Sequence, residues 1–322
     1  MNVLVKAVPE FPPATAAASS AVLARPGTSR RPADFLELTK PRIAVMALVT
    51  VAAGYLFGAA GNFRFDHLVH VLLGAGLVAA GGSALNHLWE RAADAKMHRT
   101  RRRPLPAGRV EAWEVLAYGL GLAVAGVAYL AWMLPYPGAA IAAAATAGLY
   151  VLVYTPMKTH TSWNTIVGAI PGALPPVIGW LAARESVTWE AVSLFAILFV
   201  WQLPHFYSIA YMHREDYARG GMKMLPVIEP AAHNGRLTGL ATVATAALLA
   251  GVTVLPFAVG TARWVYLIGG LLLAAWFLMR CVRFSLDRNQ QSAKSVLRGS
   301  LVYLTGVMVL LVIDGIVPRY LG

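Results

Sequence analysis

Nine apolar stretches, each long enough to cross a lipid bilayer as an α-helix, dominate this chain of 322 residues. A helix needs about 20 mostly apolar residues to span the hydrocarbon core. Charged residues make up only 13% of the sequence, whereas soluble domains typically carry about 25%. The sequence therefore predicts an all-α, polytopic membrane helix bundle. The expected spans are residues 42–61, 67–89, 113–133, 136–155, 162–183, 189–211, 237–259, 263–283 and 297–317.

Proline residues are concentrated in the fifth of these stretches, where Pro171, Pro175 and Pro176 fall within residues 162–183. A proline inside a helix removes a backbone hydrogen bond and clashes with the preceding turn. Membrane helices tolerate this where neighbouring helices or a cavity satisfy the freed carbonyl groups. We therefore expect the fifth span to be kinked.

Lysine and arginine are unequally divided between the two sides of the predicted bundle. If the N-terminus is in the cytoplasm, all but four of the 27 Lys and Arg residues lie on the cytoplasmic side. This positive-inside bias predicts an N-in, C-out topology with an odd number of spans. It also accounts for the net charge of +12 without nucleic acid as a partner. The four exceptions are Arg64, Arg184, Arg263 and Arg319.

Residues 1–33 differ in composition from the rest of the chain. They are rich in Pro, Ala, Ser and Arg, show no hydrophobic periodicity and contain a single acid, Glu10. Such a segment cannot bury a core, so we expect a disordered cytoplasmic tail, followed by one intramembrane domain over residues 34–322. The low acid content also resembles a transit peptide, which is the alternative interpretation.

A polar stripe follows the second apolar stretch. If the helix continues, Asn86, Glu90 and Asp94 stand at i, i+4 and i+8, so their oxygen-bearing side chains share one face. Carboxylates hold hard divalent cations, and ionisable groups at a membrane edge are costly unless they serve a site. Four arginines that can grip phosphate by bidentate hydrogen bonds come next: Arg99, Arg101, Arg102 and Arg103. The combination predicts a diphosphate site.

The simplest alternative for this segment is a solvated loop at the membrane surface, whose basic residues bind anionic lipid. A basic run on its own would usually be such a loop. The helical spacing of the three oxygen-bearing residues favours the diphosphate site instead.

A second polar segment, residues 201–226, begins within the sixth apolar stretch and ends on the same side of the membrane. Its acid Asp216 could hold another ion against the same diphosphate, although an ordinary polar loop is an equal alternative. His205 lies in an apolar run, where histidine more often hydrogen-bonds between helices than binds a ligand. Lys158, between the fourth and fifth spans, could meet phosphate or serve only as a topology charge.

The order and spacing of these motifs resemble the UbiA-type intramembrane prenyltransferases. The stripe and the following Met97-His-Arg-Thr-Arg-Arg-Arg-Pro-Leu105 are similar to the first signature of that family. In detail the chain resembles the haem O synthase branch, over about residues 34–318. The other motifs that carry this resemblance are Tyr154-Thr-Pro-Met-Lys158 with Thr161 and Asn164, Trp201-Gln-Leu-Pro-His-Phe206, and Asp216-Tyr-Ala-Arg-Gly-Gly-Met-Lys-Met-Leu-Pro226.

The resemblance implies a reaction and a set of site residues. The reaction would transfer farnesyl from farnesyl diphosphate to a vinyl group of haem B, with Mg²⁺ as cofactor and with addition of water, for cytochrome oxidase maturation. Haem A synthase, which would act next, is an expected partner. His205 is expected to orient the porphyrin or move a proton. The implied metal ligands are Asn86, Glu90, Asp94 and Asp216, and the implied diphosphate ligands are Arg99, Arg103, Lys158 and Lys223.

Two positions depart from the common family pattern. Members that act on aromatic acceptors have two aspartates where His213 and Tyr217 stand here. This departure argues against a symmetrical two-metal site and is characteristic of the haem branch. The nearest alternative is a UbiA-type transferase with a quinone precursor or another aromatic or tetrapyrrole acceptor. An alternative of another class is a transporter of anionic lipids or diphosphates.

The connections between spans indicate which side carries the function. Those on the expected cytoplasmic side, after the second and sixth spans, are long and polar, whereas the outer connections are short. A transporter needs access from both faces, so the short outer connections argue against one. We expect a multi-pass protein of the bacterial inner membrane, with its site facing the cytoplasm.

Overall fold

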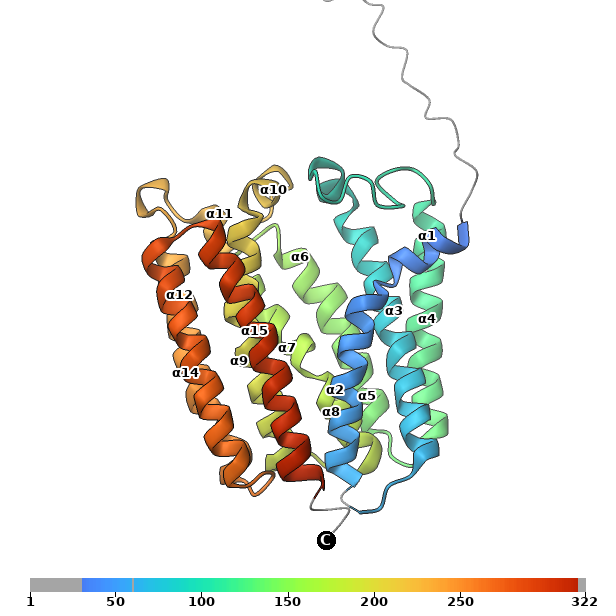
Figure 1. Cartoon of the computed structure of the whole chain (residues 1–322). Helices are drawn as coiled ribbons and strands as arrows, with labels where there is room; N and C mark the ends of the chain where they lie inside the picture. The colour runs from blue at the N-terminus through green and yellow to red at the C-terminus, as the bar shows by residue number, and fades with distance from the viewer. Residues whose placement is uncertain (1–30, 60, 318–322) are drawn as a thin grey trace, which may run out of the picture. The chain divides into compact units, whose positions relative to one another are not determined.

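Nine helical spans make up most of the part of the chain that the structure describes, residues 31–59 and 61–317 of a computed structural model (Figure 1). None of these residues forms a strand, so the predicted all-α, polytopic fold is confirmed. Five of the spans are single helices, namely α2 (Pro41–Ala59), α3 (Phe65–Lys96), α4 (Ala112–Met133), α9 (Trp189–Met212) and α14 (Trp264–Asp287).

The other four spans in this part of the chain are interrupted. Between α7 and α8 the helix breaks at Leu174, and Pro175 and Pro176 open α8. Proline is favourable in the first turn, where its missing N–H would have had no partner. The span is therefore interrupted beside the prolines for which a kink was predicted. The interrupted spans are α5 (Gly138–Gly148), η1 (Leu149–Tyr154) and α6 (Thr155–Met157); α7 (Asn164–Ala173) and α8 (Pro175–Ala183); α12 (Arg236–Val252) and α13 (Leu255–Ala258); and α15 (Gln290–Leu311) and η3 (Val312–Ile316).

Short helices gather at one end of the bundle. These are α1 (Arg31–Leu38), α10 (Arg214–Arg219), α11 (Leu225–Ile228) and η2 (Ala231–His233). In Figure 1, α1, α10 and α11 lie at the end where α3 leads into α4 through residues 97–111, and we call this the site end. The helix η3 lies at the opposite end, as an odd number of spans requires.

Two helices extend furthest beyond the spans predicted from hydropathy. The helix α3 continues to Lys96 rather than ending at residue 89, and α15 begins at Gln290 rather than at residue 297. Hydropathy marks only the part of a helix that lies in hydrocarbon, whereas charged residues propagate a helix well. Asn289 caps α15, because its side chain accepts a hydrogen bond from the backbone N–H of Ser292 at 2.8 Å.

The predicted end of the N-terminal tail falls inside a helix. Residues 1–30 lie outside the described residues, so the disordered tail stays a prediction. Arg31 to Ala33, which the sequence assigned to that tail, form the first turn of α1. Arg109 donates to Asp34 at 2.8 Å and to Glu37 at 3.3 Å. These ion pairs hold α1 in place. The helix has only eight residues, so its hydrophobic pattern is too short to predict it from the sequence.

Exposed tryptophans mark both ends of the spans. Tryptophan concentrates at the headgroup level of a bilayer, where its ring is half in apolar and half in polar surroundings. The exposed tryptophans form one belt near each end of the spans, and the hydrocarbon core lies between the two belts. The short helices α1 and α10 then lie at the membrane surface. Trp89, Trp113 and Trp163 lie towards the site end, and Trp132, Trp189 and Trp264 lie towards the opposite end.

The helices α2 and α8 pack so closely that both require glycine at the contact. A Cβ atom on Gly54 would lie 1.9 Å from the carbonyl oxygen of Pro176, and one on Gly179 would lie 1.9 Å from that of Val51. Small residues permit such approach in membranes, where van der Waals packing rather than water exclusion drives helix association. This contact fixes the kinked fifth span against the first.

Replacing Gly54 with alanine should destabilise the bundle, because the added methyl group overlaps the backbone of α8. We expect a loss of about 1–3 kcal/mol, measured as a lower melting temperature of the detergent-solubilised protein. Gly121→Ala is the matched control, since a Cβ at that exposed position of α4 meets no described atom within 4 Å. Equal melting temperatures for the two variants would contradict the close packing.

Candidate functional site

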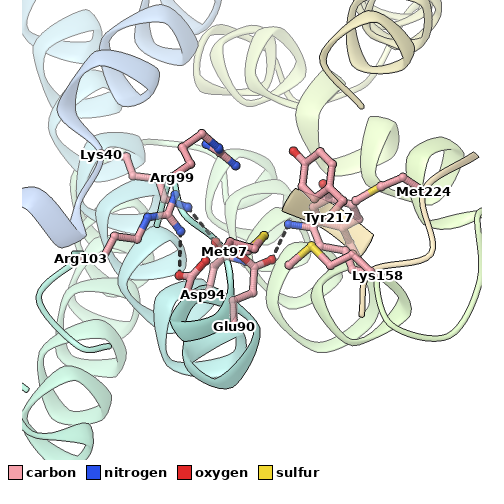
Figure 2. Close-up of a pocket in the computed structure, with 12 residues that line it drawn as sticks. Lys40, Glu90, Asp94, Met97, Arg99, Arg103, Lys158, Tyr217 and Met224 are labelled. Atoms are coloured by element: carbon pink, nitrogen blue, oxygen red, sulfur yellow. Dashed lines mark hydrogen bonds and ion pairs between the residues drawn. The ribbon is translucent and has the colours of Figure 1, made fainter. Parts of the chain in front are cut away.

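A cavity of about 160 Å³ opens at the site end (Figure 2). Its walls come from α3, the α3–α4 loop, the end of the fourth span and the segment that follows α9. Of the residues singled out in the sequence, those that line it are Asn86, Glu90, Asp94, Arg99, Arg103 and Lys158. The structure therefore brings the oxygen-bearing stripe and three of the four basic residues to one cavity.

The stripe on α3 is almost completely buried, and each of its members contacts a cation. Asn86 and Asp94 have no exposed surface and Glu90 has 9%. Figure 2 shows Arg103 approaching from one side and Lys158 from the other. Because each cation belongs to a different element, these contacts draw three segments onto α3. The pairs are Lys40 Nζ with Asn86 Oδ1 at 2.7 Å, Lys158 Nζ with Glu90 Oε1 at 2.5 Å, and Arg103 Nη1 with Asp94 Oδ2 at 2.7 Å.

The pKa values of the two lysines that line the cavity are shifted in opposite directions. Burial alone would lower the pKa of Lys158, but Tyr154 and the carboxylate of Glu90 raise this pKa well above its ordinary value. At Lys40, burial outweighs the attraction of Glu90 and lowers the pKa to about 7. The groups beside Lys158 therefore favour its charged form, whereas an added anion would be needed to favour the charged form of Lys40 to the same extent.

One fully buried oxygen of the stripe has no hydrogen-bond partner among the described residues. It is Oδ1 of Asp94, which is buried on a side chain that lines the cavity. Together with Glu90 and the amide oxygen of Asn86, it forms a donor set of the hard type that Mg²⁺ prefers. No group of three or more His, Cys, Asp or Glu residues in the described part of the chain is arranged to hold a metal alone. The residues therefore fit a Mg²⁺ ion whose remaining ligands come from phosphate and water.

Asp216 is not among the residues that line the cavity. Its two carboxylate oxygens accept hydrogen bonds from the backbone N–H groups of His98 and Arg99, at 3.1 and 3.2 Å, and one also accepts from Arg219 at 2.8 Å. Although desolvation opposes it, these donors lower the pKa of Asp216. The carboxylate thus fastens the start of the α3–α4 loop to α10. Its role as a metal ligand stays a prediction.

The side chain of Lys223 does not line the cavity either, but its backbone supports a residue that does. Its N–H donates to the carbonyl oxygen of Lys158 at 2.7 Å. Its own carbonyl accepts from the side chain of Asn164 at 3.2 Å. These bonds join the segment after α10 to the turn that carries Lys158, so the fourth span presents its lysine in a fixed position.

His205 is not among the residues that line the cavity; it lies on α9, where α9 packs against α15. Its Nδ1 is 2.8 Å from the hydroxyl of Ser300, and its ring stacks on Trp201 with centroids 5.0 Å apart. Trp201 in turn donates to the carbonyl oxygen of Ser300 at 2.7 Å. His205 therefore makes a helix-to-helix contact, which is the more usual role of a histidine in an apolar span.

The short helix α1 supports the arginine-bearing loop. Arg109, which holds the acids of α1, also donates to the carbonyl oxygen of Arg102 at 2.9 Å. Phe35 on α1 packs edge-on against Tyr118 of α4, with centroids 5.0 Å apart. The loop that carries Arg99 and Arg103 is thus tied to α1 through Arg109 and to α10 through Asp216.

The cavity also contains residues that sequence reasoning missed or left without a role. Lys40 was counted only as a topology charge, although its position directly before the first span was a signal. Tyr154 and Tyr217 belong to two of the motifs that carry the family resemblance, but a sequence does not reveal which way a loop side chain points. The remaining wall is made of the thioethers of Met97, Met222 and Met224.

Comparison with known proteins gives consistent matches over most of the chain. Residues 47–304 match the UbiA prenyltransferase family. A protein of Solibacter usitatus named protoheme IX farnesyltransferase is 45% identical over 290 residues, which covers 87% of this chain and 98% of that protein. A protein of the same name from Salinibacter ruber is 42% identical over 281 residues, with coverage of 87% and 98%.

Solved structures share the arrangement of helices. A structure described as digeranylgeranylglyceryl phosphate synthase superimposes with a TM-score of 0.74 at 17% identity, covering 88% of this chain and 98% of that one. A UbiA homolog from Archaeoglobus fulgidus, bound to GPP and Mg²⁺, gives a TM-score of 0.54 at 16% identity, with coverage of 86% and 99%. At such low identity these likenesses establish the fold alone.

The Asp216 contact predicts a measurable change in the α3–α4 loop. Asp216→Ala removes the acceptor of two backbone N–H groups, and a hydrogen bond to a charged group is worth about 1.5–3 kcal/mol. Hydrogen–deuterium exchange at His98 and Arg99 should accelerate by at least about tenfold. Glu215→Ala is the control, because that carboxylate is 81% exposed and pairs with Arg219 at 3.6 Å. Unchanged exchange in Asp216→Ala would refute the fastening role.

Proposed function

The chain belongs to the UbiA prenyltransferase family, and from that premise we infer that it transfers a farnesyl group from farnesyl diphosphate to protohaem IX, forming haem O. The two relatives that are 45% and 42% identical to it over 87% of the chain carry the name of that activity. The single observation that carries the site assignment is the cavity in which the buried stripe of α3 meets basic residues from three elements.

We propose that Asn86, Glu90 and Asp94 hold Mg²⁺ against the diphosphate. Asp94 Oδ1, which has no hydrogen-bond partner among the described residues, is available as a metal ligand. When bound, the metal would neutralise the diphosphate and stabilise the charge that develops as it leaves. Arg103 and Lys158 already lie beside these carboxylates. They are in place to donate to phosphate oxygens once the carboxylates face a metal. Arg99 and Lys40 line the same cavity and add positive charge.

The other walls of the cavity suit the carbocation side of the reaction. Met97, Met222 and Met224 are buried and pack as one cluster, with Tyr217 against it. Such a wall excludes water, so an allylic cation can persist until a porphyrin vinyl group attacks its C1. Water then adds to the resulting cation and releases a proton to solvent, which leaves a hydroxyl group. This order of events keeps water away from the farnesyl group until the carbon–carbon bond exists.

We propose that His205 orients the porphyrin. The hydroxyl of Ser300 donates its proton to the carbonyl oxygen of Leu297 at 2.7 Å, so it accepts from His205, which must carry its proton on Nδ1. Nε2 makes no hydrogen bond with the described residues and keeps its lone pair. This is the arrangement in which imidazole binds a metal such as haem iron, because a bond at one nitrogen fixes the tautomer. Proton transfer through Nε2 is the alternative role.

We place the site end on the cytoplasmic side of the bacterial inner membrane. The positive-inside bias supports this orientation, since the basic segments that follow α3 and α9 lie at that end. Farnesyl diphosphate and Mg²⁺ would then enter from the cytoplasm, while haem B and the farnesyl chain occupy the bilayer. Haem O would pass to haem A synthase, and docking to that enzyme stays a prediction.

One assay separates this function from its rivals. Membranes that contain the protein are incubated with haem B, farnesyl diphosphate and Mg²⁺, and the tetrapyrroles are analysed by mass spectrometry. Only the haem enzyme yields haem B heavier by farnesyl plus hydroxyl. A transferase for quinone precursors or a transporter would leave haem B unchanged, and that result would overturn the proposal.

Asp94→Ala should abolish that product while leaving the protein in the membrane. Loss of a carboxylate that holds the metal removes stabilisation of the leaving group, so we expect the rate to fall at least about 100-fold. Asp66→Ala is the matched control, because Asp66 begins the same helix at the opposite end and its side chain is half exposed. Activity retained by Asp94→Ala would remove the metal assignment.

His205→Ala should weaken haem binding, measured as the shift of the haem Soret band during titration of the purified protein. Ser300→Ala should shift the same band by less, because it removes only the partner that fixes the tautomer. His233→Ala, at an exposed position in η2, should behave as wild type. An unchanged haem spectrum with slower product formation in His205→Ala would instead support proton transfer, and wild-type turnover would remove both roles.

A further inference from the structure

A second hollow lies between α3 and α4, separate from the diphosphate cavity. It is a groove of about 500 Å³ that shares no lining residue with that cavity. Its lining residues are Leu88, Trp89, Arg91, Ala112, Trp113 and Leu116. Trp89 is 55% exposed and Trp113 is 69% exposed, so the described part of the chain leaves the groove open.

The groove changes character along its length. On α3, Arg91 lies one turn closer to the site end than Leu88. On α4, which runs in the opposite direction, Leu116 lies one turn deeper than Ala112. The groove is therefore polar at the part nearer the site end and apolar at the part deeper in the bundle. It also lies at the level of the tryptophan belt, where the headgroups and acyl chains of a bilayer meet.

The charge of the groove selects the kind of molecule that fits it. Arg91 is the one ionisable residue among those that line it, and no acid is present there. Arg91 forms no ion pair with any of the residues that the structure describes. Its side chain is exposed at the surface, where an arginine attracts anionic lipid by about 1 kcal/mol. A guanidinium also matches the oxygens of a phosphate in bidentate geometry.

We propose that this groove binds one phospholipid with an anionic headgroup. The phosphate lies on Arg91, and an acyl chain runs down between Leu88 and Leu116, flanked by the two tryptophans. The site is distinct from the diphosphate cavity, because Arg91 projects from the exposed face of α3 whereas its neighbour Glu90 is buried on the other face.

Native mass spectrometry of the full-length protein, released from detergent micelles, tests this site. Phosphatidylglycerol and phosphatidylcholine with identical acyl chains are added in turn, and bound lipid is counted. Wild type should retain one phosphatidylglycerol in preference to phosphatidylcholine. Arg91→Ala should reduce that preference by about fivefold, which corresponds to about 1 kcal/mol.

Two further variants separate the groove from a general effect of charge. Arg236→Ala removes the same charge from an exposed position at the start of α12, and it should retain the lipid as wild type does. Ala112→Trp narrows the groove while keeping Arg91, and it should lose the lipid. Equal retention of the two lipids, an unchanged preference in Arg91→Ala, or a dimer that buries the groove in place of lipid would each overturn the proposal.

Discussion

The buried oxygens of α3 need positive charge beside them, and this need organises the site end of the molecule. A carboxylate without a partner at the edge of a membrane costs several kcal/mol, which is a large fraction of a protein's stability. Glu90 and Asp94 are both buried, and each has a cation within 2.7 Å. Because Lys158 and Arg103 come from different connections, compensating the charge of α3 also assembles the walls of the cavity.

A second set of contacts holds those walls still. Asp216 accepts hydrogen bonds from backbone N–H groups of the α3–α4 loop, and the backbone N–H of Lys223 donates to the carbonyl oxygen of Lys158. Diphosphate chemistry relies on donors that are in place before the leaving group develops its charge, since they then need no reorganisation during the reaction. The polar segment of residues 201–226 therefore supports the site by binding the backbone of neighbouring segments, and not only by placing side chains in the cavity.

Periodicity revealed much of this design, and its limits have physical causes. Nine spans follow from hydropathy, because the bilayer imposes one length and one polarity on each helix. The stripe of Asn86, Glu90 and Asp94 follows from helical spacing alone. Lys40 was missed because the chain before α2 turns through a left-handed residue, Lys40 itself at φ 49°, which no hydrophobic pattern encodes. The backbone contacts of Asp216 were missed because pairing across 117 and 118 residues depends on tertiary packing.

The distances along the chain between paired charges bear on how the protein is made. Arg103 follows Asp94 by nine residues, so that pair can close as soon as α3 and its loop have left the ribosome. Lys158 follows Glu90 by 68 residues. Glu90 directly follows Trp89, which lies in the tryptophan belt at the site end, so its carboxylate can stay in water until the fourth span supplies that lysine. The two acids of the stripe therefore acquire their ion-pair partners at different stages of synthesis, Asp94 from the loop that follows it and Glu90 from a later span.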